Sequence, residues 1–356
     1  MSRGAHKSSN GFLREERSDL CRMGRGMSLK GEHNRDFAAH GISHFPSDWP
    51  GPGPVDRMIH DLPHLPLRSP ALEWWYVDGH LKTDDGEELS LFASFFRMAW
   101  GLNKVTGEIE YYHAVTWALS DVNGKVCHTD SLVDKRAPEV GLEWIRQGRG
   151  ARDPCLNRAI AEVLKKGHIP TPDHVFEGSV HIGEKSLKLN YGSAQFEGLG
   201  DGSYHLHLFN SRENTGCDLM FYPEKQPVRH GKDGIVRGTH EKEEMFYYFI
   251  SRLRLTGTVT LNGREQPVSG SGWYDREFGG QYGTEIKSLS ETAWNWTGIH
   301  LDDGSDLTAY SFFRRETGEP LEEYLILVGP EGRRIFSPSF KFEPVRWWRS
   351  TRTFLD

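Results

Sequence analysis

An internal repeat constrains this fold more than any other feature of the sequence. Residues 74–81 read Trp-Trp-Tyr-Val-Asp-Gly-His-Leu, and Asp-Asp-Gly, Leu and Phe-Phe-Arg follow as far as Arg97. Residues 294–314 contain Trp, His-Leu, Asp-Asp-Gly, Leu and Phe-Phe-Arg in the same order, with the same spacing from Trp to His. Coincidence is the alternative, but an ordered run of this length favours a duplicated unit. The chain is therefore predicted to hold two related domains.

Each copy has the pattern of an antiparallel hairpin, because aromatic-rich segments flank an Asp-Gly turn. Further strands are predicted at 111–119, 125–133, 174–182, 186–191, 204–209, 218–222 and 245–261. One helix is predicted over 154–166, where Asp153 can cap the first turn, Pro154 suits it and Gly167 ends it. Many short strands with one short helix predict an all-β fold of antiparallel barrels or sandwiches.

The composition of the chain suggests where the domains begin and end. Residues 1–43 are polar and mixed in charge, and are predicted to be a disordered extension. Residues 44–262 form the predicted N-terminal domain, with a Pro-, Gly- and His-rich lead-in over 44–70. Residues 263–356 form the predicted C-terminal domain. This domain is expected to be incomplete, because the chain ends soon after the second copy of the repeat.

Charge and hydropathy exclude several classes of function. The net charge of -7 gives no electrostatic reason to expect nucleic acid as a partner. No apolar run approaches the ~18 residues of a membrane span, and no signal peptide is evident, so a soluble, cytoplasmic protein is expected. The cysteines are far apart and form no CxxC pair, which favours reduced thiols over a metal or redox motif (Cys21, Cys127, Cys155 and Cys217).

Residues 270–279 carry the strongest chemical signal, Gly-Ser-Gly-Trp-Tyr-Asp-Arg-Glu-Phe-Gly. In a strand, Trp273, Asp275 and Glu277 share one face. Tyr274, Arg276 and Phe278 share the other. Two carboxyl groups on one aromatic face repel each other and raise at least one pKa, and a general acid needs such a protonated carboxyl. Asp275 and Glu277 are therefore the catalytic candidates, and a structural ion pair with Arg276 or another basic residue is the alternative.

Alternation also sorts the two copies of the repeat. One face of the first copy carries Trp74, Tyr76, Asp78 and His80, and the matching face of the second carries Trp294, Trp296 and His300. These side chains are either core aromatics with hydrogen-bonded histidines or the walls of an aromatic cavity with a polar handle. The predicted substrate-binding residues are Trp74, Trp75, Tyr76, His80, Tyr248, Trp273, Tyr274, Trp294 and Trp296.

Other motifs narrow the chemistry further. His205 and His207 alternate along a strand and could hold a metal, but no third ligand stands at a fixed spacing, so no metal site is predicted. The chain lacks the G-x-S-x-G elbow, the P-loop, G-x-G-x-x-G after a strand and H-E-x-x-H. Acid–base or shape-driven chemistry on an apolar ligand remains, or binding without chemistry.

The segments 73–81, 95–97 and 272–279 together resemble the hydroxyneurosporene synthase (carotenoid hydratase, CrtC) and AttH-like family of tandem lipocalin-like proteins. The resemblance covers about residues 69–356. It implies two lipocalin-like β-barrel domains with a ligand site in or between them. The family's activities include adding water to an isolated C=C bond of a carotenoid, and related fungal members are pericyclases that fold a polyene. The family's proposed proton donor, the acid of Trp-Tyr-Asp, corresponds to Asp275.

We therefore expect a cofactor-independent enzyme that hydrates a C=C bond of an apolar small molecule, such as a carotenoid, a terpenoid or a polyketide. A pericyclase in secondary metabolism and a non-catalytic lipid or pigment carrier are the alternatives. The expected partner is the apolar substrate, with no nucleic acid, and transient contact with a membrane surface is expected for substrate pickup.

Overall fold

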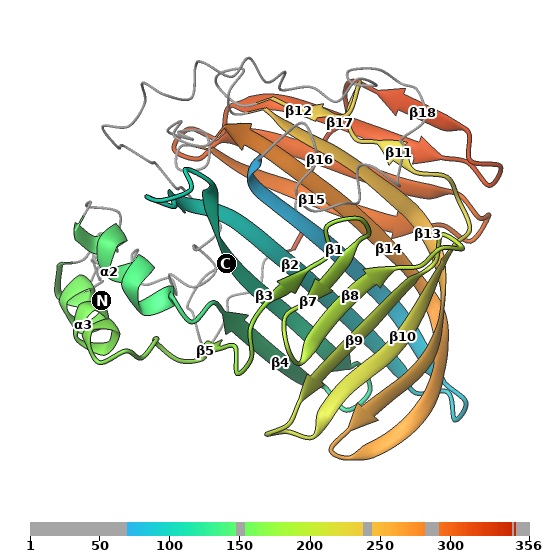
Figure 1. The fold of residues 1–356 in the computed structure, drawn as a ribbon. Helices are drawn as coiled ribbons and strands as arrows, with labels where there is room; N and C mark the ends of the chain where they lie inside the picture. The colour runs from blue at the N-terminus through green and yellow to red at the C-terminus, as the bar shows by residue number, and fades with distance from the viewer. Residues whose placement is uncertain (1–69, 147–153, 238–243, 282–291, 344, 347–356) are drawn as a thin grey trace, which may run out of the picture.

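The computed structural model describes residues 70–146, 154–237, 244–281, 292–343 and 345–346 (Figure 1). The predicted extension 1–43, the lead-in up to residue 69, Cys21 and the last residues from 347 lie outside the described part. Within that part, neither helix has the length and apolar composition needed to cross a bilayer.

A large curled sheet forms most of the molecule (Figure 1). Its path runs β5-β4-β3-β2-β1-β14-β13-β10-β9-β8-β7-β6, and β11 and β12 pair with β13. All of its strand pairs are antiparallel except β4 with β5. The strands are β1 (Pro70–Thr83), β2 (Glu88–Leu102), β3 (Ile109–Asp121), β4 (Val126–Val133), β5 (His174–Val175), β6 (His181–Ile182), β7 (Lys188–Asn190), β8 (Ala194–Gly198), β9 (Tyr204–Asn210), β10 (Thr215–Pro223), β11 (Val228–Arg229), β12 (Ile235–Val236), β13 (Met245–Leu261) and β14 (Arg264–Gln281).

A second, four-stranded sheet packs against one face of β13 and β14 (Figure 1). It consists of β15 (Thr292–His300), β16 (Asp306–Arg314), β17 (Pro320–Val328) and β18 (Arg334–Ser337), in that order. The predicted all-β, antiparallel fold is thus confirmed.

The helix predicted over 154–166 is α3 (Pro154–Lys165), and it packs against a second helix, α2 (Ala137–Arg146). The sequence did not predict α2, because Pro138 and Gly141 are poor helix formers. Pro138 is tolerated in the first turn, and Gly141 lets the Leu164 side chain approach within 2.9 Å of where a Cβ would stand. The strand predicted over 174–182 is instead the two short strands β5 and β6, and β8, β11 and β12 were not predicted.

The main hydrophobic core fills the inside of the curled sheet. Side chains from distant strands meet there, as when Phe95 of β2 stacks on Phe196 of β8 with ring centroids 6.0 Å apart. Trp75, Tyr248 and Tyr274 belong to this core and are at most 1% exposed. The alternation predicted for the two motifs turns Trp75 away from Trp74 and Tyr76, and Tyr274 away from Trp273 and Asp275, and the structure confirms this.

A second hydrophobic core lies between the two sheets. Tyr247, Phe249 and Trp273 contribute to it from the large sheet. Tyr310, Phe312 and Tyr324 are among the residues that contribute from the small sheet. Strands β13 and β14 are therefore buried on both faces, which explains the unbroken apolar run at the start of β13.

Arg276 does not pair with the acids of its own motif. Its guanidinium lies on the inner face and binds Glu73 Oε2 at 2.5 Å, while Arg97 binds the other oxygen of the same carboxylate. All three side chains are fully buried. The expectation that Arg276 is the structural partner of Asp275 and Glu277 is wrong, because strand alternation turns these acids to the opposite face of β14.

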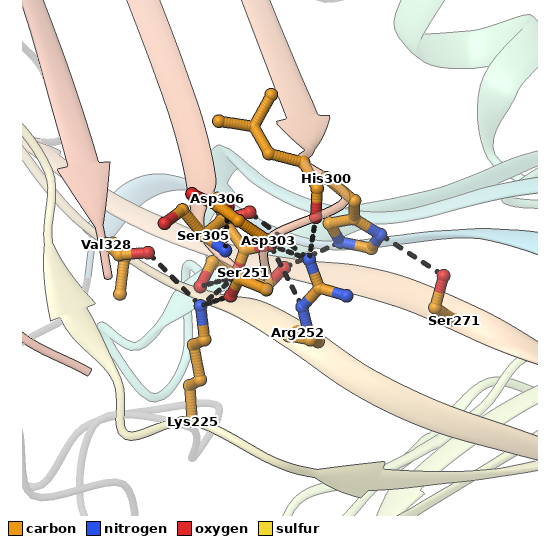
Figure 2. A network of polar contacts seen from close by, with 11 residues as sticks. Lys225, Ser251, Arg252, Ser271, His300, Asp303, Ser305, Asp306 and Val328 are labelled. Atoms are coloured by element: carbon orange, nitrogen blue, oxygen red, sulfur yellow. Dashed lines mark hydrogen bonds and ion pairs between the residues drawn. The ribbon is translucent and has the colours of Figure 1, made fainter. Parts of the chain in front are cut away.

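A polar network attaches the small sheet to β13 (Figure 2). Asp306 is fully buried and accepts contacts from Lys225 Nζ at 2.7 Å, Arg252 Nη2 at 2.6 Å and Ser251 Oγ at 2.8 Å. A β-bulge places Ser251 and Arg252 together opposite the single residue Trp273. Both side chains of the bulge therefore reach the same carboxylate, which strict alternation would not permit.

Both copies of the repeat are hairpins, formed by β1–β2 and β15–β16. Their registers differ, because Trp74 pairs with the second phenylalanine of its copy, Phe96, whereas Trp294 pairs with the first, Phe312. The strand that carries the acidic motif, β14, belongs to the large sheet. The division of the chain into domains at residues 262 and 263 stays a prediction.

Candidate functional site

Asp275 lies on the face of β14 that the small sheet covers, and only 5% of its surface is exposed. The indole Nε1–H of Trp273 donates a hydrogen bond to its Oδ1 at 2.7 Å, and the hydroxyl of Tyr247 also donates to its carboxylate. Burial nevertheless raises the pKa of Asp275 well above its ordinary value, and the nearby carboxyl of Asp78 raises it further. Both effects favour the protonated form of this carboxyl group.

Glu277 lies two residues further along the same face and is 8% exposed. Burial raises its pKa well above the ordinary value, and the carboxyl of Asp275 is the second cause. The predicted pairing of two acids on one aromatic face is thus present. Desolvation contributes more to the raised pKa values than the mutual repulsion expected from the pattern.

A third acid, Asp78, belongs to the same group and was not among the predicted site residues. In the pairing of β1 with β14, Tyr76 lies opposite Asp275 and Asp78 lies opposite Trp273. The Tyr76 hydroxyl donates to Asp78 Oδ2 at 2.8 Å. Burial raises the pKa of Asp78 to about 6, against the lowering effects of Tyr76 and His80.

The second copy of the repeat supplies an aromatic cover for these acids. Trp296 meets Trp273 edge to face at 6.0 Å and meets Tyr76 in the same way at 5.9 Å. His300 stacks beside Trp273 with ring centroids 6.2 Å apart. Its Nδ1 is hydrogen-bonded to Ser271 Oγ, and its Nε2–H donates to the Ser251 carbonyl oxygen at 2.8 Å (Figure 2). Tyr76 and Trp296 hold equivalent places in the repeat, so the two copies meet directly at this pair of rings.

A buried histidine, His230, packs behind Tyr247, and it was not predicted from the sequence. His230 stacks on Tyr247 with ring centroids 3.9 Å apart, and its Nδ1 lies 2.6 Å from the hydroxyl of Tyr324. Burial lowers its pKa well below the ordinary value, so the imidazole is neutral. Tyr247 is thus held between His230 and the carboxyl group to which it donates.

The predicted substrate-binding residues fall into two separate groups. Tyr76, Trp273 and Trp296 surround the acids. Trp75, Tyr248 and Tyr274 lie in the core on the other side of the sheet. A ligand that touches Asp275 therefore cannot also touch these three side chains without crossing the sheet.

The remaining predicted residues lie at the margins of the group. Trp74 is half-buried and packs near Phe96 at 6.4 Å, His80 is exposed, and Trp294 is 44% exposed. On another part of the sheet, His205 and His207 both contact the carboxylate of Asp218. Within the described residues, no three His, Cys, Asp or Glu side chains form a metal-binding group.

The sequence pattern gave some indication of Asp78 but none of His230, the two residues that were not predicted. Asp78 stands between Tyr76 and His80 in the alternation of the first repeat, so its face was predictable even though its role was not assigned. His230 lies in an irregular connection between β11 and β12, where no periodic pattern indicates which way a side chain points.

Taken together, the site offers a buried proton donor, a partly buried carboxylate and several aromatic faces. A protonated acid can donate to a substrate of low basicity, and aromatic faces can stabilise a cation formed nearby. The arrangement therefore suits a reaction that passes through positive charge on an apolar molecule.

Comparisons with known proteins agree with this picture of the fold. The model of a family described as AttH-like matches residues 159–354, which is more than half of the chain. An AttH-type protein of Nitrosomonas europaea superimposes with a TM-score of 0.61 at 22% identity, over 85% of this chain and 78% of that chain. Kievitone hydratase from Nectria haematococca gives a TM-score of 0.53 at 12% identity, over 87% of this chain and 76% of that one. At these identities the likeness is one of fold, and no curated protein matches the chain at a significant level.

Proposed function

Because the chain belongs to the AttH-like family, we propose that it is a cofactor-independent enzyme that adds water to a C=C bond of an apolar small molecule. The observation that carries this proposal is the carboxyl group of Asp275. It is almost fully buried, its pKa is raised well above the ordinary value, and it lies among aromatic side chains. The fold that this chain shares with kievitone hydratase supports the proposal.

In the proposed reaction Asp275 donates its proton to one carbon of the alkene, and a carbocation forms at the other carbon. The Trp273 and Tyr247 donors then stabilise the carboxylate that is left behind. The rings of Tyr76 and Trp296, which meet on the same face, would stabilise the cation. Water adds to the cation and loses one proton to a carboxylate of the site, which gives the alcohol, so the reaction needs neither a redox step nor a cofactor.

The class of substrate follows from the strength of the acid. A carboxylic acid protonates an isolated alkene most easily when the cation is tertiary, as in the trisubstituted double bonds of isoprenoid chains. We therefore extend the proposal to a carotenoid- or terpenoid-like substrate, as in hydroxyneurosporene synthase. Pickup of the substrate from a membrane surface and a cytoplasmic location are parts of the same proposal.

The test is turnover of lycopene and of a geranyl-bearing phenol in water labelled with ¹⁸O. The wild type should form an alcohol that carries the label, and Asp275→Asn should reduce its formation at least about 100-fold, the usual contribution of a general acid. Asp302→Asn is the matched control, because Asp302 lies in an exposed turn. Undiminished hydration by Asp275→Asn would overturn the role of Asp275.

A cyclase is the second candidate, favoured by the dense aromatic surroundings of a hydrogen-bond donor. It would return a product of unchanged mass without ¹⁸O, and it would tolerate Asp275→Asn better, since shape rather than proton transfer drives the reaction. Tight retention of an unaltered ligand would instead indicate a carrier.

A further inference from the structure

Along this face, Asp78 lies between the buried Asp275 and the exposed His80. Its side chain is half-buried, whereas the next side chain along that face of β1, His80, is exposed. Asp78 lies opposite Trp273 in the register, one alternation step from the position opposite Asp275. Diagonal neighbours of this kind have Cα atoms ~7–8 Å apart, and the two carboxyl groups are close enough for Asp78 to raise the pKa of Asp275.

The carboxylate of Asp78 is held by two hydrogen-bond donors. The Tyr76 hydroxyl donates to Oδ2 at 2.8 Å, and the backbone N–H of Trp273 donates as well. A carboxylate has about four lone-pair sites, so these two donors leave acceptor capacity for a water molecule. The orientation of the group is thus set before any ligand arrives.

We propose that Asp78 is the base that accepts a proton from the attacking water. This inference rests on the proposed hydration. The alkene takes the proton of Asp275, so a C–H bond forms and the π bond is lost. The water oxygen then forms the C–O bond to the cation, and its surplus proton passes to Asp78. Return of that proton from Asp78 to Asp275 after product release restores the starting state, and the net reaction is alkene plus water to alcohol.

The charge states of the two acids agree with these roles. The pKa of Asp78 is about 6, because burial raises it, and burial also raises the pKa of Asp275 well above its ordinary value. At pH 7 a carboxyl group with a pKa of about 6 is mostly ionised, whereas the shift at Asp275 favours its protonated form. Paired carboxyl groups divide the roles of base and acid in this way. The titratable groups around Asp78 are Tyr76 and His80 of β1 and Asp275 of β14, with His300 of β15 beyond His80.

The decisive experiment compares Asp78→Asn with Asp275→Asn on lycopene in deuterated water and in ¹⁸O water. Asp78→Asn should lower alcohol formation at least about 100-fold, yet recovered lycopene should still gain deuterium, because Asp275 can protonate the alkene and take a proton back. Asp275→Asn should lose both signals. Normal hydration by Asp78→Asn, with hydration abolished in Asp275→Asn, would overturn the role of Asp78 and leave the proposed function standing.

A purely electrostatic role for Asp78 gives a different pH profile. If Asp78 only raised the pKa of Asp275, its replacement would move the alkaline fall of the rate to lower pH and keep the acid-side rise. As the base, Asp78 produces that rise near pH 6, and Asp78→Asn removes it. The Tyr76 hydroxyl stabilises the ionised carboxylate of Asp78 and so lowers its pKa. Tyr76→Phe removes this hydrogen bond, so the rise should move to higher pH.

Infrared titration of the substrate-free protein tests the same inference without turnover. The wild type should show one carboxyl group that ionises near pH 6 and is lost in Asp78→Asn. A protonated carboxyl band that persists at pH 8 should weaken in Asp275→Asn. If the band near pH 6 remained in Asp78→Asn, the inference would fail even if hydration were observed. If neither probe were hydrated although the infrared bands behaved as expected, the proposed function would fail instead.

Discussion

The indole N–H of Trp273 donates to the carboxyl of Asp275 at 2.7 Å, although the two residues are alternate neighbours on one strand. Trp273 in turn stacks on Phe249 with centroids 5.0 Å apart and lies beside His300. The donor is thus held by both sheets. It favours the ionised form of the acid, which is the form that exists after proton donation.

Trp273→Phe should slow hydration without unfolding the protein. The substitution keeps the ring that stacks on Phe249 but removes the donor, and a hydrogen bond to a charged group contributes ~1.5–3 kcal/mol. We expect a fall in kcat of roughly 10- to 100-fold. Trp117→Phe is the control, because Trp117 is buried in the other core and its Nε1 has no hydrogen-bond partner among the described residues. Equal rates in both variants would contradict the role of the indole.

The buried acids should make stability depend on pH. Because the pKa values of Asp275 and Glu277 are raised in the folded state, the folded protein keeps protons that the unfolded chain has released above about pH 4. The free energy of unfolding should therefore fall as the pH rises from about 4 through the raised pKa values.

Asp275→Asn and Glu277→Gln should each reduce the loss of unfolding free energy as the pH rises. The free energy of unfolding of each variant, relative to the wild type, should therefore be higher at pH 7 than at pH 4.5. Urea denaturation between pH 4.5 and 8 measures this, with the exposed Asp302→Asn as the reference. The prediction is wrong if the variants and the wild type lose stability in parallel.

Glu73→Gln should be strongly destabilising. Its carboxylate lies between Arg97 and Arg276, and removal of its charge would leave two buried guanidinium groups uncompensated. Breaking a buried pair in this way costs ~3–5 kcal/mol, measured as a shift in the denaturation midpoint. Glu110→Gln, at the partly exposed pair with Arg136, should cost no more than ~1 kcal/mol. Similar losses in the two variants would argue against a special role for the buried cluster.

Asp306→Asn should loosen the small sheet. Lys225 and Arg252 would lose their shared buried carboxylate, so we expect faster hydrogen exchange in β15 and β16 and a loss of ~3–5 kcal/mol. Because Trp296 lies on β15 and covers the acids, turnover should fall as well. Glu319→Gln, at the exposed pair with Arg314, is the control. Unchanged exchange rates in β15 would show that the network does not attach this sheet.

Strand alternation was predictable because it is a local property. Successive side chains of an extended backbone point to opposite faces, so the sequence alone assigned Asp275 and Glu277 to one face and Arg276 to the other. The hairpins of the repeat and the helix α3 were likewise indicated by nearby turn and capping residues.

Contacts between distant strands were not predictable from such patterns. That Arg276 pairs with Glu73, or that Asp78 stands beside Asp275, depends on the register between β1 and β14, whose residues are about two hundred positions apart. The bulge that directs Ser251 and Arg252 to Asp306 breaks the alternation on which sequence reasoning depends.

The sequence by itself determined which side chains share a face of each strand, and so identified a carboxyl group among aromatic residues. The tertiary structure alone decided that the small sheet covers this face. That covering sets the chemistry, since an acid on an open sheet would remain ionised in water, whereas burial between two sheets raises the pKa of Asp275 and favours its protonated form.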